Sequence, residues 1–246
     1  MRRHFLALPL ALVIAGTATA QWGDDRGPGV APRNAGGALV YPIDGFTAVS
    51  LALPANVDVR VGPGFSVRAT GPARAFNDIR VTRNGSSLQI ERRYRGRVRD
   101  EDAARGVRFV VTMPRIDGAN IGGSGGIRVD RVNGRRFDAA IGGSGSLTLD
   151  SVAVDRLSGE IGGSGSIVAG GTTGDLKVNV GGSGRFAGER LRARAATVAI
   201  AGSGGVRAQV DGNATVSIAG SGDADLGPRA RCAVNRVGSG RARCGS

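Results

Sequence analysis

Ile121-Gly122-Gly123-Ser124-Gly125 is the stretch that decides the fold, because close variants of it return along the rest of the chain, the last as Val237-Gly238-Ser239-Gly240. Its serine recurs at intervals of 20, 20, 19, 20, 18 and 18 residues. The recurring serines are Ser124, Ser144, Ser164, Ser183, Ser203, Ser221 and Ser239. A period this regular indicates a repeat architecture, in which each repeat is one structural unit that stacks on its neighbours.

The residues between these serines predict strands. After Ser144 the apolar residues are Leu147, Leu149, Val152, Val154, Leu157 and Ile161. They are mostly two apart and rich in β-branched types, whereas a helix needs apolar residues three and four apart. We therefore predict an all-β fold, a right-handed parallel β-helix or solenoid with coils of 18–20 residues over residues 119–246. Neighbouring coils should lie about 4.8 Å apart.

The Gly-Ser corners have a structural interpretation and two functional alternatives. Glycine suits a sharp corner because it adopts positive φ and leaves room for the next coil. The serines, including the one of the last corner, then form a structural turn ladder, and the preceding apolar residue of each corner, Val237 in the last, lies in the core. A phosphate-binding loop is disfavoured, because no lysine or helix follows the glycines. A Ca²⁺-binding solenoid would need a nine-residue period and an aspartate in each loop.

The first residues predict export. Arg2 and Arg3 precede an apolar run from Phe5 to Ile14, and Ala18-Thr19-Ala20 provides a cleavage site, so residues 1–20 form a signal peptide and no membrane span. Either an ordinary secretory signal or a twin-arginine signal fits this segment. We expect a periplasmic or extracellular protein of the cell envelope. Residues 21–40 lack apolar periodicity and predict a flexible leader.

Residues 41–118 predict a β-strand-rich N-terminal part. Val57–Val61 and Phe65–Ala69 alternate between apolar and polar residues around Gly62-Pro63-Gly64, so they predict two strands that close as a hairpin. The pattern leaves two alternatives open for the whole segment. It either continues the solenoid or forms a separate sandwich.

Arginine dominates the charge of this chain. Of 33 basic residues only Lys177 is a lysine, and loss of Arg2 and Arg3 with the signal would lower the formal charge from +13 to +11. Five arginines gather in one segment, at Arg92, Arg93, Arg95, Arg97 and Arg99. They offer a possible contact for a polyanion, but a solvated loop neutralised by Asp100, Glu101 and Asp102 is the favoured interpretation. Because the protein is exported, we expect no nucleic-acid partner.

The histidine and cysteine content restricts the chemistry. His4 is the one histidine and would leave with the signal, which excludes Ser-His-Asp catalysis, Cys-His catalysis and histidine-ligated metals. We expect no catalytic residue, cofactor or metal. Cys232 and Cys244 predict a disulfide in an oxidising compartment, where it would pin the last coil.

A row of carboxylates supports one enzymatic alternative. Asp130, Asp150 and Glu189 share one repeat position, interrupted by Gly170, and paired carboxylates catalyse glycoside cleavage. Parallel β-helices host polysaccharide lyases and hydrolases, an argument from fold analogy. Against it, the nearby arginines Arg128, Arg131 and Arg190 would neutralise these carboxylates as surface pairs.

Three further motifs accompany the repeat and carry a family resemblance. They are Gly45-Phe46-Thr47-Ala48-Val49, Pro54-Ala55-Asn56-Val57-Asp58-Val59 and Phe109-Val110-Val111-Thr112-Met113-Pro114. Together with the Ile-Gly-Gly-Ser-Gly ladder they resemble the bacterial head GIN domain family, the proposed heads of auto-transporter adhesins. The resemblance runs from Val40 to Ser239 and implies one domain over about residues 41–240, a β-helix-like envelope protein without known catalytic residues.

The resulting functional hypothesis is a non-enzymatic binding or adhesion module. Its solenoid faces would contact an acidic glycan, an envelope polymer or another protein, because long repetitive faces suit polymeric partners. A polysaccharide lyase or hydrolase is the alternative. The sequence does not indicate the oligomeric state.

Overall fold

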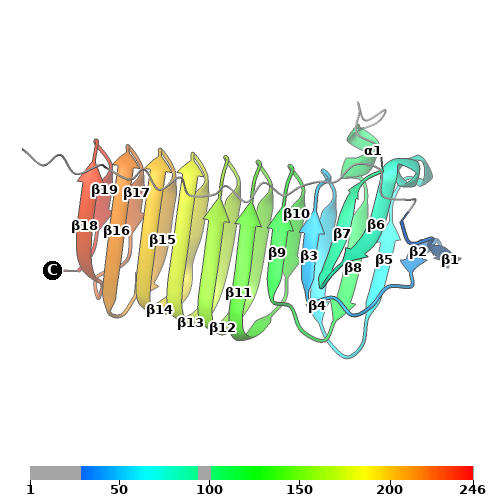
Figure 1. The fold of residues 1–246 in the computed structure, drawn as a ribbon, viewed down its shortest axis with the longest axis horizontal. Coiled ribbons are helices and arrows are strands. Elements are labelled where there is room, and N and C mark those ends of the chain that lie inside the picture. Colours follow the sequence, from blue (N-terminus) through cyan, green and yellow to red (C-terminus); the bar gives the residue numbers. More distant parts are fainter. Residues whose placement is uncertain (1–28, 94–100, 246) are drawn as a thin grey trace, which may run out of the picture.

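The computed structural model describes residues 29–93 and 101–245, which form a stack of β-coils along one long axis (Figure 1). The predicted all-β solenoid is confirmed. Each strand of the repeat region pairs in parallel with its equivalents in the adjacent coils, so the backbone hydrogen bonds are satisfied between coils. The predicted signal peptide, residues 1–20, lies outside the described residues.

The repeat region contains eleven of the strands. They are β9 (Gly118–Ile121), β10 (Gly126–Val129), β11 (Val132–Ile141), β12 (Ser146–Ile161), β13 (Ser166–Gly182), β14 (Arg185–Gly202), β15 (Gly205–Val210), β16 (Asn213–Gly220), β17 (Asp223–Asp225), β18 (Arg231–Val237) and β19 (Arg241–Arg243). The register matches equivalent repeat positions, since Ile121 lies beside Ile141 and Ile141 beside Ile161. Apolar residues therefore stack on apolar residues through the interior.

Four strands of the N-terminal part continue the same stack. They are β3 (Ala48–Leu51), β4 (Asn56–Val61), β7 (Ser87–Arg92) and β8 (Arg108–Met113). The strand β3 pairs in parallel with both β7 and β9, and β4 pairs in parallel with both β8 and β10. The β3–β4 coil thus lies between the β7–β8 coil and the β9–β10 coil. Of the two alternatives that the sequence leaves open, these strands continue the solenoid.

The remaining elements cover the N-terminal end of the stack. They are β1 (Arg33–Ala35), β2 (Ala38–Tyr41), β5 (Ser66–Thr70), the 3₁₀ helix η1 (Ala73–Asp78), β6 (Ile79–Asn84) and α1 (Glu101–Arg105). The strands β1 and β2 form a hairpin within the expected leader. Gly36 and Gly37 have φ values of 60° and 80°, which suit its two-residue turn. No helix among residues 29–93 and 101–245 is long and apolar enough to cross a membrane.

The predicted hairpin of Val57–Val61 with Phe65–Ala69 is wrong. The strand β8 lies between β4 and β5 and pairs in parallel with β4 and antiparallel with β5. Its Phe109 and Val111 are fully buried, so β8 brings apolar side chains to both neighbours. A third strand between the two buries more apolar surface than the local hairpin could.

The core consists of apolar columns that run along the solenoid axis. One column contains the residue that precedes each Gly-Ser corner, and every member is 2% exposed. Its members are Ile121, Ile141, Ile161, Val180, Ile200 and Ile218. Each such burial contributes about 1.5–3 kcal/mol before entropy is subtracted.

The last corner departs from this pattern, and the prediction that Val237 lies in the core is wrong. The register places Arg236 beside Ile218 and Val237 beside Ala219, and Val237 is 72% exposed. The apolar residue of the last corner follows the core position of the register by one residue, so its side chain points outward. The core column ends at Ile218.

Candidate functional site

The seven repeat serines lie on one edge of the solenoid, which we call the corner ridge (Ser124 to Ser239, at the top of Figure 1). All seven are exposed. The hydroxyl groups of Ser221 and Ser239 lie 3.0 Å apart and share a hydrogen bond. The ridge is held mainly by backbone bonds between corners, such as Ser183 N–H to the Gly163 carbonyl at 3.2 Å.

The close approach of neighbouring coils explains why most of the corner residues are glycines. A Cβ on Gly143 would stand 2.6 Å from the Gly123 carbonyl oxygen of the preceding coil. Positive φ, expected at every corner, occurs at this second glycine in the last four corners only, for example 127° at Gly202. The first corner glycine is open, since the nearest atom to a Cβ on Gly142 is 4.0 Å away. The corner ridge is therefore a scaffold whose glycines keep the coils close.

Arg92 and Arg93 are the described part of the arginine segment, and they lie at the end of β7. Ile90 of β7 lies beside Leu51, and Arg108 of β8 lies beside Asn56, so β7 and β8 flank the position at which the β3–β4 coil has its four-residue corner, residues 52–55. Arg92 ends β7, and the backbone N–H of Arg93 donates to the Asp78 carbonyl at 2.8 Å. The other predicted contacts, Arg95, Arg97 and Arg99, lie outside the described residues. A polyanion contact at this segment stays a prediction.

Each of the three candidate catalytic carboxylates has a partner. Asp130 accepts hydrogen bonds from the backbone N–H groups of Val61 and Arg131, at 2.9 and 2.6 Å. Asp150 accepts from Arg128 Nε at 2.8 Å, and this bond and the charge of Asp150 raise the pKa of Arg128. The Arg131 side chain is 3.8 Å from Asp130.

Glu189, the third carboxylate, lies 3.4 Å from Arg207 rather than beside Arg190. No three histidine, cysteine, aspartate or glutamate side chains among residues 29–93 and 101–245 come together as a metal site. The row of carboxylates therefore behaves as a set of surface pairs, which is the interpretation that its arginines indicated.

The predicted disulfide between Cys232 and Cys244 is confirmed, with the two Cα atoms 6.1 Å apart. Cys232 lies beside Ala214, and Cys244 continues the strand that runs beside Asp223–Asp225 and the buried Leu226. Both cysteines pack against the apolar core. The bond thus ties two strands of the last coil together across the end of the interior.

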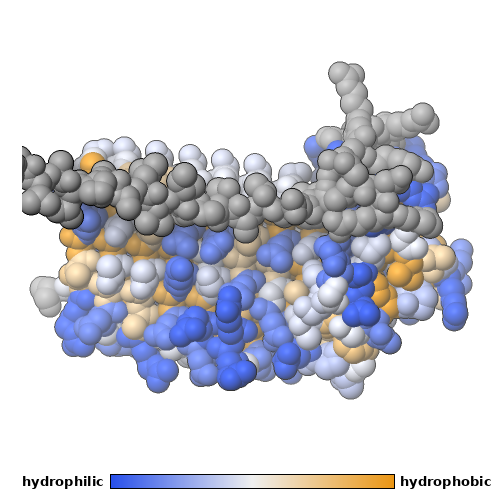
Figure 2. Space-filling model, in the orientation of Figure 1, coloured by the Kyte–Doolittle hydropathy of each residue, from blue (hydrophilic) through white to orange (hydrophobic). Residues whose placement is uncertain are grey.

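The structure contains a further surface that the sequence motifs do not indicate. We call it the front wall: the outward side chains of the strands that end at the corner ridge, namely β3, β7, β9, β16 and β18 and the last parts of β11, β12, β13 and β14 (facing the viewer in Figure 1). Figure 2 shows pale and apolar residues over the part of this wall nearest the C-terminus, with hydrophilic residues along its lower edge.

The front wall contains a polar hollow of about 560 Å³ over β11, β12 and β13. Arg136, Asp138, Arg156, Glu160 and Lys177 line it around a floor that includes two alanines. Arg136 Nε and the Asp138 carboxylate are 2.7 Å apart, which raises the pKa of Arg136. Neither Glu160 nor Lys177 forms an ion pair with another described residue.

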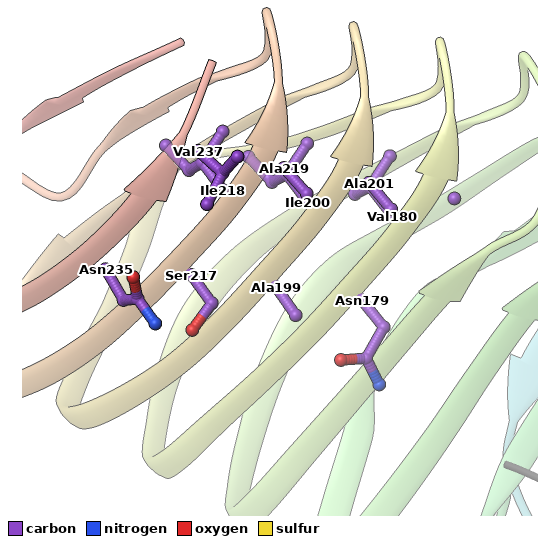
Figure 3. Close-up of a pocket in the computed structure, with 11 residues that line it drawn as sticks. Asn179, Val180, Ala199, Ile200, Ala201, Ser217, Ile218, Ala219, Asn235 and Val237 are labelled. Atoms are coloured by element: carbon purple, nitrogen blue, oxygen red, sulfur yellow. The ribbon is translucent and has the colours of Figure 1, made fainter. Parts of the chain in front are cut away.

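Next to the polar hollow lies a second one of about 430 Å³, which we call the axial groove. One side is a row of small or amide side chains from successive coils: Asn179, Ala199, Ser217 and Asn235. The other side is a row next to the corner ridge: Gly181, Ala201, Ala219 and Val237. Figure 3 shows the two rows running along the solenoid axis. None of the lining residues is charged.

A listing of outward residues strand by strand would have found this groove. No sequence motif indicates the groove, because its residues are small and common and carry no catalytic signature. The signal is an absence of charge over two consecutive segments, Thr197–Ala201 and Thr215–Ala219, in a chain with 33 basic residues, and Arg236 is the one charged residue of the next segment, Ala233–Val237.

Several solved structures share this fold. A protein of Bacteroides fragilis described as a "putative adhesin" has 18% identity and a TM-score of 0.78, over 88% of this chain and 100% of that one. A "putative lipid binding protein" of Parabacteroides distasonis has 18% identity and a TM-score of 0.68, over 87% and 96%. A "putative adhesin" of Parabacteroides merdae has 13% identity and a TM-score of 0.65, over 84% and 95%.

These likenesses establish the fold alone, because all are below 25% identity. No curated protein matches the chain. A family model does match, over residues 45–241, which is most of the chain and runs from β3 through β18 to the first residue of β19. The chain therefore belongs to the family described as "Putative auto-transporter adhesin, head GIN domain".

Proposed function

We propose that the protein is an exported, non-enzymatic binding module that contacts a partner in the cell envelope through its front wall. The observation that carries this proposal is the distribution of charge. Arg136, Arg156 and Lys177 line the polar hollow of the front wall, whereas the side chains of β14, β16 and β18 that line the axial groove are small and uncharged. Depletion of charge in a continuous patch is typical of the centre of a binding surface.

The shape of the wall supports a polymeric partner. Its strands repeat with the coil spacing of about 4.8 Å, so any contact made on one coil can be made again on the next. A polymer with its own repeat can use several coils at once, and its affinity grows with the number of contacts. Adhesion, the role that the family description suggests, needs binding of this kind.

The enzymatic alternative has weaker support. The carboxylates Asp130, Asp150 and Glu189 are engaged with backbone or arginine partners and lie away from the two hollows of the front wall. A general acid or nucleophile has to reach the bond that it cleaves. Binding without turnover is therefore the function that this surface supports best.

A glycan and cell-wall polymer array tests the proposal with residues 21–246, the chain without its predicted signal. Ala201→Arg places a long charged side chain on the front wall, and Ala187→Arg places the same side chain on the wall that follows the corner ridge. We expect retention of at least one polymer, weakened by Ala201→Arg and unchanged by Ala187→Arg. No retention of any polymer, or equal loss in both variants, would contradict the proposal.

A further inference from the structure

We propose that the axial groove binds an uncharged glycan chain that lies along the solenoid axis. This inference rests on the proposed function, because it assigns a ligand class to part of the front wall. It differs from the acidic partner that the net charge alone indicates.

The row of Asn179, Ser217 and Asn235 supplies the polar contacts. Their amide and hydroxyl groups form no side-chain hydrogen bond with another described residue. The parallel register places them on one line, with Ala199 between the first two, at the coil spacing of about 4.8 Å. Amides and hydroxyls both donate and accept, so this line can bind a row of ligand hydroxyl groups.

The opposite row supplies an apolar surface. Ala201 and Ala219 present methyl groups, and Val237 presents an isopropyl group that is 72% exposed. Figure 3 shows these side chains on the corner side of the groove, facing the polar row across a flat floor of backbone. Covering Val237 would remove from water the most exposed large apolar side chain of the described residues.

A pyranose chain can contact both rows of the groove favourably, whereas other ligands can contact only one row in this way. Each sugar ring has an apolar face of C–H groups and an edge of hydroxyl groups, which match the methyl row and the amide row. An acyl chain would cover the methyl row and desolvate the neighbouring amides without replacing their hydrogen bonds, which is costly. A peptide that adds as a strand needs an open sheet edge, whereas the groove lies on the face of the sheet.

Charge and size narrow the ligand further. No cation lines the groove, since the guanidinium of the adjacent Arg236 donates to the Gly240 carbonyl oxygen at 3.1 Å, while β14 carries exposed Arg190, Arg192 and Arg194 on another wall. An acidic polymer would be drawn there. The groove spans three coil intervals, about 14 Å, and covers on the order of 200 Å², whereas a stable protein interface needs about 800 Å² from each partner. It is sized for about three sugar rings.

Isothermal titration with named oligosaccharides tests the inference. The probes are cellohexaose, chitohexaose, xylohexaose and mannohexaose as uncharged chains, hexagalacturonate as an acidic chain, and laurate as an acyl chain. The variants are Ala219→Arg, which fills the groove, and Ser217→Ala with Asn235→Ala, which removes polar contacts. Ala187→Arg is the matched control. Unchanged melting temperatures show that each variant folds.

We expect at least one uncharged hexasaccharide to bind, about tenfold or more weakly to Ala219→Arg and to the double variant, and equally to Ala187→Arg. Affinity should rise from the dimer to the trimer and then level off. Binding of hexagalacturonate alone would overturn the inference and leave the proposed function standing. Binding of laurate alone, lost in Ala219→Arg, would overturn the inference in favour of a lipid. If none of these probes binds in the titration while the array retains a polymer, the inference is overturned and the proposed function stands. If the array retains no polymer either, both the inference and the proposed function are overturned.

Discussion

Gly145 lies so close to Ile121 of the preceding coil that a Cβ on Gly145 would stand 2.5 Å from the Ile121 Cγ2 atom. The same Cβ would come within 2.6 Å of the Gly125 carbonyl oxygen. The third glycine of each corner is thus required by contact between coils. The first glycine has no such neighbour, and alanine replaces it in two natural corners, at Ala201 and Ala219.

Gly145→Ala should therefore destabilise the protein and Gly142→Ala should not. Overpacking of this kind costs about 1–3 kcal/mol, because either the backbone or Ile121 has to move. At Gly142 the nearest atom to an added Cβ is 4.0 Å away, so we expect a change within about 0.5 kcal/mol. Urea unfolding of both variants measures the difference. Equal stability of the two would show that the coils can separate without cost.

Tyr41 gives a pH dependence. Its side chain is 5% exposed in the N-terminal core, near Phe109, and burial raises its pKa above 10.0. The folded state therefore holds the phenol proton to higher pH than the unfolded state does. This contribution to stability is complete below the unfolded pKa and is lost as the pH rises through the folded pKa.

We expect the stability of the wild type to fall more steeply than that of Tyr41→Phe, which has no phenol to ionise, as the pH rises above about 10. Urea unfolding at several pH values checks the slope, and phenolate absorbance follows the titration. Parallel slopes would mean that Tyr41 ionises as readily in the folded protein as in the unfolded chain.

The disulfide should act locally. It closes a loop of sequence separation 12 and contributes about 2–3 kcal/mol by restricting the unfolded chain. In a stack of coils that contact only their neighbours, loss of this bond should release β18 and β19 first. Hydrogen exchange of the reduced protein should rise in these two strands and stay low in β12 and β13. The double variant Cys232→Ser with Cys244→Ser should show the same hydrogen exchange as the reduced wild type, and reductant should not change it. Uniform loss of protection in all coils would contradict local action.

Turnover provides a separate check on the proposal that the protein is not an enzyme. We expect no cleavage products from polygalacturonate, alginate or hyaluronan, since Asp150 is bonded to Arg128 at 2.8 Å. The assay follows new reducing ends and unsaturated products. Cleavage that disappears in Asp150→Ala and persists in Asp155→Ala, a matched change at another exposed aspartate, would establish the lyase or hydrolase alternative.

The sequence predicts the solenoid because the repeat carries both its period and its contacts. The serine intervals set the coil length, and the apolar residues before each corner become one buried column ending at Ile218. The β3–β4 coil was harder to place, since its corner reads Ala52-Leu53-Pro54-Ala55 and lacks the motif. Its place between two coils that come later in the chain depends on contacts that no local pattern encodes.

The candidate site was predictable in part. The cysteines and the arginine partners of Asp130 and Asp150 follow from residue type and spacing, whereas the partner of Glu189 is Arg207 and not the predicted Arg190. The axial groove does not follow from them, because its rows at Ala199 and Ala201 become continuous only when the register is known. The register also corrects the predicted position of the Val237 side chain, which the motif places inside and the structure places on the surface of the groove.

Hydroxyl-radical footprinting of Val237 tests the central claim that the front wall is the binding surface. Val237 is 72% exposed in the axial groove, whereas Phe65, 38% exposed, lies at the N-terminal end and serves as an internal reference. In the presence of purified bacterial cell-wall polysaccharide, we expect oxidation of Val237 to fall several-fold and oxidation of Phe65 to stay constant. Binding of the polysaccharide with no protection of Val237 would contradict the account.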